Sequence, residues 1–100
     1  MTAAVHETLQ ELDDGCVAQR HVNGDPGAFG TLVDRYQSRL LTYVNRTIGN
    51  RDRADDLVQK VFIRVSRHLH RFDRTENFSA WIHGIASKVA NADVQFLKSL

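Results

Sequence analysis

The chain has 100 residues, with 13 Lys and Arg against 12 Asp and Glu, a formal net charge of +1, and 42% hydrophobic residues. This composition is typical of one soluble globular domain, and a chain of this length buries one core, so two domains are not expected. No stretch approaches the ~18 consecutive apolar residues of a membrane helix, and the first ten residues lack the pattern of a secretion signal. A transmembrane or secreted protein is therefore not expected.

The cysteine, proline and glycine content narrows the fold class. The single cysteine, Cys16, excludes an internal disulfide and a cysteine-based zinc site, and it fits the reducing cytoplasm. One Pro, six Gly and the lack of alternating β-branched residues between turn dipeptides leave little material for strands. Helices are the expected element.

The net charge of the whole chain is close to zero, but charge is distributed unevenly along the sequence. Residues 1–34 hold six acidic residues and one basic residue, a net charge of −5. Residues 35–74 hold ten basic and four acidic residues, a net charge of +6, and residues 75–100 are neutral. The basic middle segment indicates a polyanion or an acidic partner, although charge alone is equally compatible with a solvated helix face.

The N-terminal third predicts one short helix and the start of a long one. Residues 1–11 are expected to form a weak helix or a frayed arm. Asp13 or Asp14 then caps a short helix that ends near Gly24. In Gly24-Asp25-Pro26, Asp25 is a cap and Pro26 suits the first helical position. Apolar residues then recur at helical spacing at Phe29, Leu32, Val33, Tyr36, Leu40, Tyr43, Val44 and Ile48.

Two further helices complete the predicted fold. Gly49 is a stop signal, and Asp52 is expected to cap a second long helix, followed by a loop over residues 71–77. A third long helix begins near Phe78, with Asn77 or Ser79 as its cap, and continues toward the C-terminus. The predicted fold class is all-α, a small bundle of three main helices plus a short N-terminal helix.

The sequence carries no recognisable catalytic or metal-binding pattern. His68 and His70 are two residues apart and point to different sides of a helix, so they are not a chelating pair. Asp55 and Asp56 diverge by about 100 degrees as helix neighbours, which does not suit a pair of catalytic carboxylates. Phosphate-binding glycine loops and hydrolase motifs are missing. Neither an enzyme nor a bound cofactor or metal is predicted.

Four motifs stand in a fixed order over about residues 12–90. They read Gly24-Asp25-x-x-Ala28-Phe29-x-x-Leu32-Val33-x-x-Tyr36-Gln37, then Ala54-Asp55-Asp56-Leu57-Val58-Gln59-Lys60-Val61-Phe62, then Phe72-Asp73 and Phe78-Ser79-Ala80-Trp81-Ile82-His83-Gly84-Ile85-Ala86. In this order and spacing they resemble region 2 of bacterial extracytoplasmic-function (ECF) sigma factors. The resemblance implies a helical domain over residues 12–100, after the arm of residues 1–11, that docks on RNA polymerase and opens the promoter −10 element. The family's region 4 is not expected within this chain.

The resemblance implies that the second long helix binds the coiled coil of the polymerase β′ clamp. Its candidate polymerase-binding residues are Asp55, Asp56, Gln59, Lys60 and Ile63. Carboxylates beside an amide offer acceptors to a basic partner helix, and Ile63 is an apolar residue on this polar face. The alternative is a solvated charged face.

The loop before the third helix resembles the family's base-capture loop. Arg71 and Arg74 are expected to contact phosphates, and Asp73 and Asn77 to read the edge of a flipped base. Phe72, Phe78 and Trp81 are expected to anchor the core rather than to stack on bases. Trp81 is also expected to link the second and third long helices together with Phe62.

The third helix departs from the family where a cluster of basic residues is usual. Its candidate DNA-binding residues are Ser79, His83, Ser87, Lys88, Asn91 and Gln95. Each missing phosphate contact lowers the salt dependence of binding by about 0.9 in logarithmic slope, so weak binding of duplex DNA is expected.

Two functions compete on these observations. The first is a transcription initiation domain that binds the β′ subunit and the non-template strand of the −10 element, with an anti-sigma factor as a further partner. The second is a sigma-like interaction module that binds an anti-sigma factor or polymerase without reading DNA. A generic helical dimerisation domain would leave the arginine-rich loop unexplained. We predict the first function, in the cytoplasm.

Overall fold

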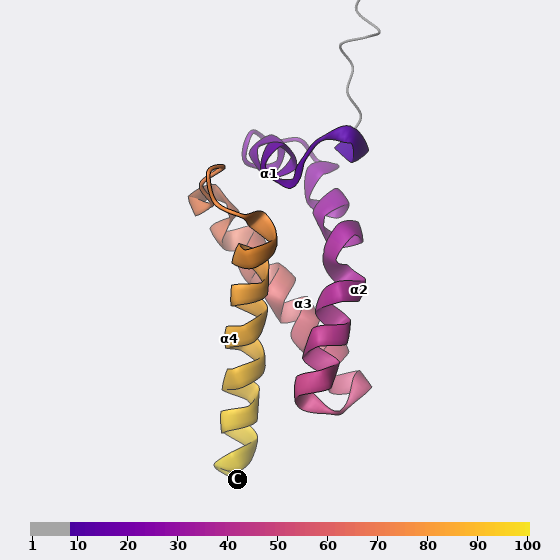
Figure 1. The fold of residues 1–100 in the computed structure, drawn as a ribbon, viewed down its shortest axis with the longest axis vertical. Helices are drawn as coiled ribbons and strands as arrows, with labels where there is room; N and C mark the ends of the chain where they lie inside the picture. Colours follow the sequence, from indigo (N-terminus) through magenta and orange to yellow (C-terminus); the bar gives the residue numbers. More distant parts are fainter. Residues whose placement is uncertain (1–8) are drawn as a thin grey trace, which may run out of the picture.

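The computed structural model describes residues 9–100, and every regular element among them is a helix (Figure 1). The elements in chain order are η2 (Leu9–Glu11), α1 (Asp14–Val22), α2 (Ala28–Ile48), α3 (Arg51–His68), η3 (Leu69–Arg71) and α4 (Phe78–Lys98). This confirms the predicted all-α bundle of three main helices and one short N-terminal helix.

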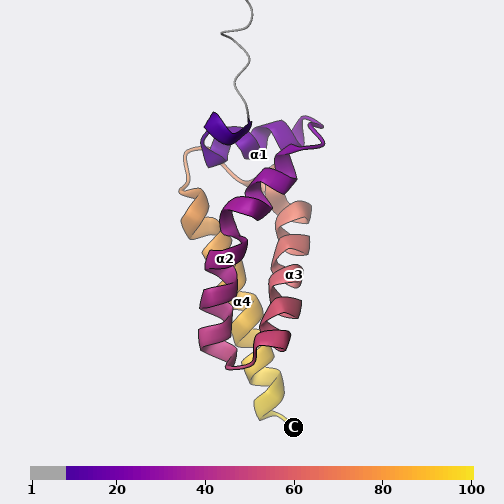
Figure 2. The same ribbon diagram turned by 90° about the vertical axis from the view of Figure 1, so that its right-hand side faces the viewer.

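The three long helices lie side by side, and α1 crosses one end of them (Figures 1 and 2). α2 and α3 run antiparallel through a tight turn, and α4 packs against both. The core is apolar, and no polar or charged residue in the described range is buried. The large side chains that are fully buried are Val17, Leu32, Leu40, Val44, Val61, Val65, Leu69 and Ile82. Burial of this surface is the main source of stability.

Two helix starts differ from the sequence-based expectation. α2 begins at Ala28 rather than at Pro26, because Pro26 and Gly27 form a turn in which the Asp25 carboxylate accepts the Gly27 amide at 3.0 Å. Asp52 is not the cap of α3. Gly49 adopts a left-handed φ of 77°, which reverses the chain so tightly that Asn50 becomes the cap.

Arg35 fastens the segment before α1 to α2. Its guanidinium donates to the carbonyl oxygens of Leu9, Gln10 and Leu12 and pairs with Asp14 at 2.9 Å. The Tyr36 hydroxyl donates to the same carboxylate, and burial raises the pKa of Tyr36 to about 12. Of the expected arm over residues 1–11, residues 1–8 lie outside the described range, and Leu9–Glu11 form a short 3-10 helix on this anchor.

Phe62 lies in the core and Trp81 packs against this core, as expected, but the two rings have different partners. Trp81 is half-buried and packs against Phe72 and Phe78, with ring centroids 5.3 and 5.6 Å apart. Phe62 is buried and contacts Phe29 of α2, at 6.3 Å. The difference arises because Phe62 lies on the side of α3 that faces α2, which spacing within one helix does not reveal. The three rings of the Trp81 cluster hold the loop over residues 72–77 against α4.

The last turns of α4 extend past the ends of α2 and α3 (Figures 1 and 2). Phe96 is 56% exposed and Leu97 is 43% exposed, so these two residues lie outside the core. Within residues 9–100, none of the helices combines the length and the hydropathy needed to cross a membrane.

An ion pair between α3 and α4 makes stability sensitive to acid. Arg53 donates two hydrogen bonds to Asp93, at 2.6 and 2.7 Å, and these bonds lower the pKa of the Asp93 carboxyl. A lowered pKa stabilises the fold above the unfolded value of about 3.9, and this contribution is lost as the pH falls through the folded value. We expect the free energy of unfolding to drop less for Asp93→Asn than for the parent between about pH 6 and about pH 3. Urea melts at both pH values test this, and equal drops would contradict it.

Candidate functional site

A hollow of about 430 Å³ lies where the N-terminus of α1 meets the loop before α4. We call it the loop hollow, and it is lined by Asp13, Asp14, Gly15, Arg74, Glu76, Asn77, Phe78 and Ser79. Three of these residues are acidic and one is basic, so the formal charge of the lining is −2. The structure thus brings Arg74, Asn77 and Ser79 of the predicted DNA-binding set together around a cavity rich in hydrogen-bond acceptors.

The loop side chains are partly held by local hydrogen bonds. Asp73 accepts the Thr75 amide at 2.9 Å, which lowers the pKa of Asp73, and Asn77 caps α4 by accepting the Ala80 amide at 3.0 Å. The guanidinium of Arg74 donates to the Cys16 sulfur at 2.9 Å. These bonds give the loop a defined shape and leave the Asn77 amide nitrogen available as a donor.

A polar stripe of α4 faces α2. His83 lies 2.8 Å from the Ser79 carbonyl oxygen through Nδ1, and its ring contacts the rings of Tyr36 and Tyr43 on α2. Over the next two helical turns, Asn91 donates to the Ser87 hydroxyl at 3.3 Å. The structure therefore places Ser79, His83, Ser87 and Asn91 on one face with the loop hollow at its end.

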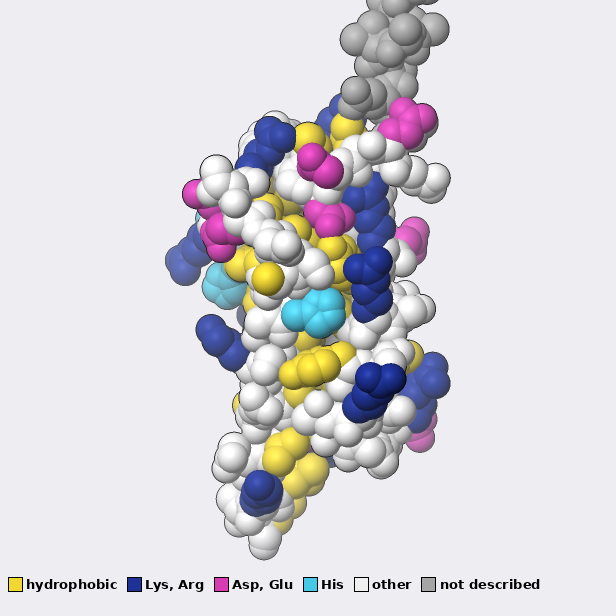
Figure 3. Space-filling view, in the orientation of Figure 1, with side chains coloured by type: hydrophobic (Ala, Val, Ile, Leu, Met, Phe, Trp, Pro, Cys, Tyr) yellow, Lys and Arg dark blue, Asp and Glu magenta, His cyan; other side chains and the backbone are white. Residues whose placement is uncertain are grey.

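Basic side chains of α2 flank this stripe (Figure 3). The exposed Arg39 guanidinium lies 5.4 Å from the centre of the Tyr36 ring, which itself contacts Phe78 at 5.4 Å. We call the surface formed by the α4 stripe and Arg39 the α2–α4 face. It pairs hydrogen-bonding groups on one helix with positive charge on the other.

Three candidate DNA-binding residues lie elsewhere. Arg71 and Lys88 line a hollow of about 320 Å³ between α3 and α4, together with Arg64, His68, Trp81 and Ile85. Gln95 is exposed near the end of α4. The predicted DNA-binding set is thus divided between two sides of α4.

The predicted polymerase-binding set is also divided. Asp55, Gln59 and Ile63 line a groove of about 570 Å³, which we call the α2–α3 groove, and its other lining residues are Val33, Gln37, Leu41, Val58 and Phe62. Ile63 is 51% exposed at its edge, and Asp56 is exposed beside it. Lys60 instead lines a separate hollow between α3 and α4.

Several lining residues were not identified from the sequence. The sequence pattern indicates Asp13 and Asp14 only as helix caps and places Val33 and Gln37 only in a motif of the first long helix. It singles out neither Gly15, Arg39 nor Leu41. Their roles depend on which helices pack against each other, and neither residue spacing within a helix nor composition determines this packing. Within residues 9–100, no group of three or more His, Cys, Asp or Glu side chains is placed to hold a metal ion.

Comparison with known proteins decides the family. The model of sigma-70 region 2 matches residues 32–92, which is more than half of the chain. The chain belongs to the sigma-70 region 2 family. The matched segment of this region 2 domain runs from near the start of α2 to near the end of α4, so it includes the α2–α3 groove and the loop before α4.

Relatives of this region 2 domain include ECF sigma factors. It is 35% identical over 66 residues to ECF RNA polymerase sigma factor SigW of Bacillus subtilis, and 35% identical over 81 residues to ECF RNA polymerase sigma-E factor of Escherichia coli K12. These matches cover 66% and 81% of this chain but only 35% and 42% of the two relatives. The chain thus spans well under half the length of either.

A solved structure shares the fold. An engineered region 2 of sigmaE, determined by NMR in complex with GTAAAA, matches with a TM-score of 0.77 and 36% sequence identity. The match covers 84% of this chain and 87% of that one.

Proposed function

We propose that this region 2 domain binds RNA polymerase and recognises the single-stranded −10 element of promoters. The observation that carries the proposal is the close structural match to a region 2 that was solved in complex with GTAAAA. The sigma factors among the curated relatives support the polymerase part of the proposal. The α2–α4 face and the α2–α3 groove give each ligand its own surface.

The DNA strand is proposed to lie on the α2–α4 face. Single-stranded DNA is bound by positive charge that follows the backbone and by polar or aromatic groups that hold the bases. Arg39 supplies charge from α2, and His83 and Asn91 supply hydrogen-bonding groups from α4. Most of this polar face is uncharged, which favours a single strand over the more densely charged duplex.

One flipped base is proposed to enter the loop hollow. The acidic lining at Asp13 and Glu76 repels phosphate but offers acceptors to the exocyclic amino group of a base. The free amide nitrogen of Asn77 adds a donor at the same place. The hollow therefore suits adenine or cytosine better than thymine, whose base edge carries no amino group.

The polymerase is proposed to bind at the α2–α3 groove, through the coiled coil of its β′ clamp. Ile63 offers an apolar contact at the edge of the groove, and Asp55 and Gln59 offer acceptors to basic side chains. Lys60 is not part of this surface, because it lines the hollow on the other side of α3. An anti-sigma factor would act by covering the same groove.

A second candidate is an interaction module without DNA readout. The observation that favours it is the low charge of α4, where Lys88 and Lys98 are the basic residues other than histidine. In that case the α2–α3 groove would still bind a protein, and the α2–α4 face would not bind DNA.

Polymerase binding tests the assignment of the groove. We expect Ile63→Glu to weaken retention of core polymerase by about tenfold or more, because it places a charge where an apolar contact is buried on binding. Lys60→Glu is the matched control on the same helix and is expected to leave retention unchanged. Both residues are exposed, so both variants should fold. Quantitative pull-down measures retention. A larger loss for Lys60→Glu than for Ile63→Glu would indicate that the polymerase binds on the other side of α3.

A further inference from the structure

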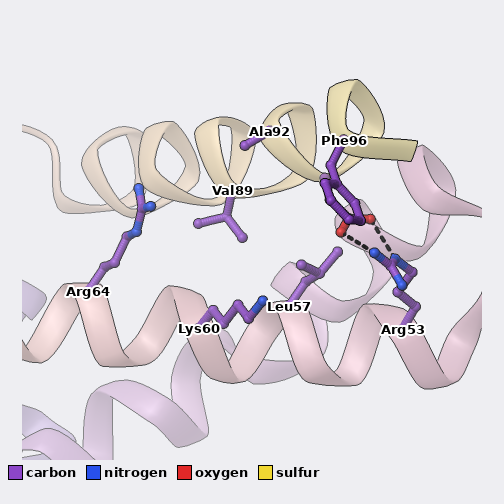
Figure 4. A pocket seen from close by; sticks show the side chains of 8 residues that line it. Arg53, Leu57, Lys60, Arg64, Val89, Ala92 and Phe96 are labelled. Carbon is purple, nitrogen blue, oxygen red and sulfur yellow. Dashed lines mark hydrogen bonds and ion pairs between the residues drawn. The ribbon is translucent and has the colours of Figure 1, made fainter. Parts of the chain in front are cut away.

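A second groove runs along the other side of α3, between α3 and α4. One half has a volume of about 350 Å³ and an apolar floor that includes Leu57, Val89 and Ala92 (Figure 4). The other half is the hollow of about 320 Å³ beside Trp81 and Ile85. Arg64 lines both halves, so they adjoin each other, and we call them together the α3–α4 groove.

The floor of this groove has the spacing of a helix-binding seam. Ile85, Val89, Ala92 and Phe96 line it and follow one another at intervals of four, three and four residues. This is the a and d spacing by which one helix packs against another. Val89 is buried in the bundle, whereas Ala92 and Phe96 are exposed. The seam thus continues beyond the contacts that the domain itself makes.

The rim of the groove is strongly basic. Its charged lining residues are Arg53, Lys60, Arg64, Arg71, Lys88 and Asp93, with a formal charge of +4. The one carboxylate is neutralised by Arg53, as Figure 4 shows. Among residues 9–100, the other four basic side chains have no ion-pair partner in the chain. Charges beside an a and d seam select the partner helix by complementarity.

We propose that the α3–α4 groove binds an acidic amphipathic α-helix of another protein. Apolar side chains of that helix would pack on Ala92 and Phe96, and its carboxylates would pair with Lys60 and Arg64. A DNA strand fits this groove less well, because Trp81 is half-buried under Phe72 and Phe78 and much of the floor is aliphatic. The proposal does not depend on DNA or polymerase binding, since the groove lies on the opposite side of α3 from the α2–α3 groove.

The single tryptophan of the chain reports on the groove directly. Trp81 lines one half of it, so its fluorescence should change when a ligand without tryptophan binds. The probe is a synthetic peptide of about 21 residues with Leu at its a and d positions and Glu at e and g, which also prevents self-association. The control peptide carries Lys in place of Glu. We expect saturable binding of the first peptide to the full chain and none of the second.

Charge reversal tests where the peptide binds. We expect the double variant Lys60→Glu, Arg64→Glu to weaken binding by about tenfold or more, and Phe96→Ser to weaken it as well. Arg67→Glu is the matched control, because Arg67 is exposed on α3 but does not line the groove. Circular dichroism verifies that each variant is folded.

Three results would overturn the proposal. One is equal affinity for the acidic and basic peptides, and another is an equal loss of affinity in the Arg67→Glu control. The third is binding of a single-stranded oligonucleotide that changes Trp81 fluorescence and is abolished by the same double reversal, since the groove would then be a nucleic-acid surface. Retention of polymerase by the Lys60→Glu, Arg64→Glu variant is measured separately. A negative result with the peptides therefore leaves the proposed polymerase binding unaffected.

Discussion

Ile82→Ala is expected to lower the free energy of unfolding by about 2–5 kcal/mol. Ile82 is fully buried on α4, where that helix meets α2 and α3. The substitution removes apolar contacts and leaves a cavity that a close-packed core fills only in part. Because domains of this size are stable by about 5–15 kcal/mol in total, this loss is a large fraction of the free energy of unfolding. Urea denaturation measures the change.

Gly84→Ala on the same helix is the matched control with the opposite sign. A methyl group at Gly84 would meet no atom within 4 Å, and the residue is exposed in the middle of α4. Alanine in place of an interior helical glycine stabilises by about 0.5–1 kcal/mol. A loss below about 1 kcal/mol for Ile82→Ala would show that α4 is not held by the core as described.

Arg39→Ala is expected to weaken binding of single-stranded DNA for all sequences alike. Removing one phosphate contact should also reduce the logarithmic salt slope of binding by about 0.7. Arg67→Ala is the control, because it removes the same charge from an exposed position on α3, away from the α2–α4 face. Fluorescence anisotropy titrations at several salt concentrations measure both quantities. Equal effects of the two variants would indicate general attraction rather than a bound strand.

Asn77→Ser separates base recognition from helix capping. Serine keeps an oxygen that can accept the Ala80 amide, so the cap of α4 and the stability should be largely retained. It lacks the amide nitrogen, so the preference for one base at the loop hollow should relax while overall affinity changes less. Titration with strands that differ at single positions tests this. An unchanged base preference would exclude Asn77 from readout.

The fold could be predicted from the sequence because its signals are local. The spacing of Leu32, Tyr36 and Leu40 defines a helix by itself, and Asn77 caps α4 as one of the two caps predicted. The start of α3 was missed because it depends on the left-handed turn at Gly49, which moves the cap to Asn50. Asp52, the cap predicted from the sequence, lies two residues after Asn50 and therefore falls inside the helix.

The site could be predicted only in part because it depends on which helices meet. Lys60 and Gln59 are neighbours on one polar face in the sequence, yet α2 and α4 pack on either side of α3 and place them in different grooves. Arg39 belongs to the α2–α4 face because its guanidinium lies over the Tyr36 ring, which packs against Phe78 of α4. The resemblance to sigma factors identified the candidate residues of the loop and of the polar helix face. The tertiary structure was needed to show that these residues lie on separate surfaces.

Binding of the single-stranded −10 element is the function that we propose for this domain. The most direct measurement is a fluorescence anisotropy titration of the chain with a labelled single strand that contains GTAAAA, the sequence in the complex of the similar region 2. The same strand in a duplex and a strand of scrambled sequence are the controls. We expect the single strand to bind more tightly than both, with an affinity that falls steeply with salt. Equal affinities, or no binding at low salt even with core polymerase present, would contradict the claim and favour the protein-interaction module.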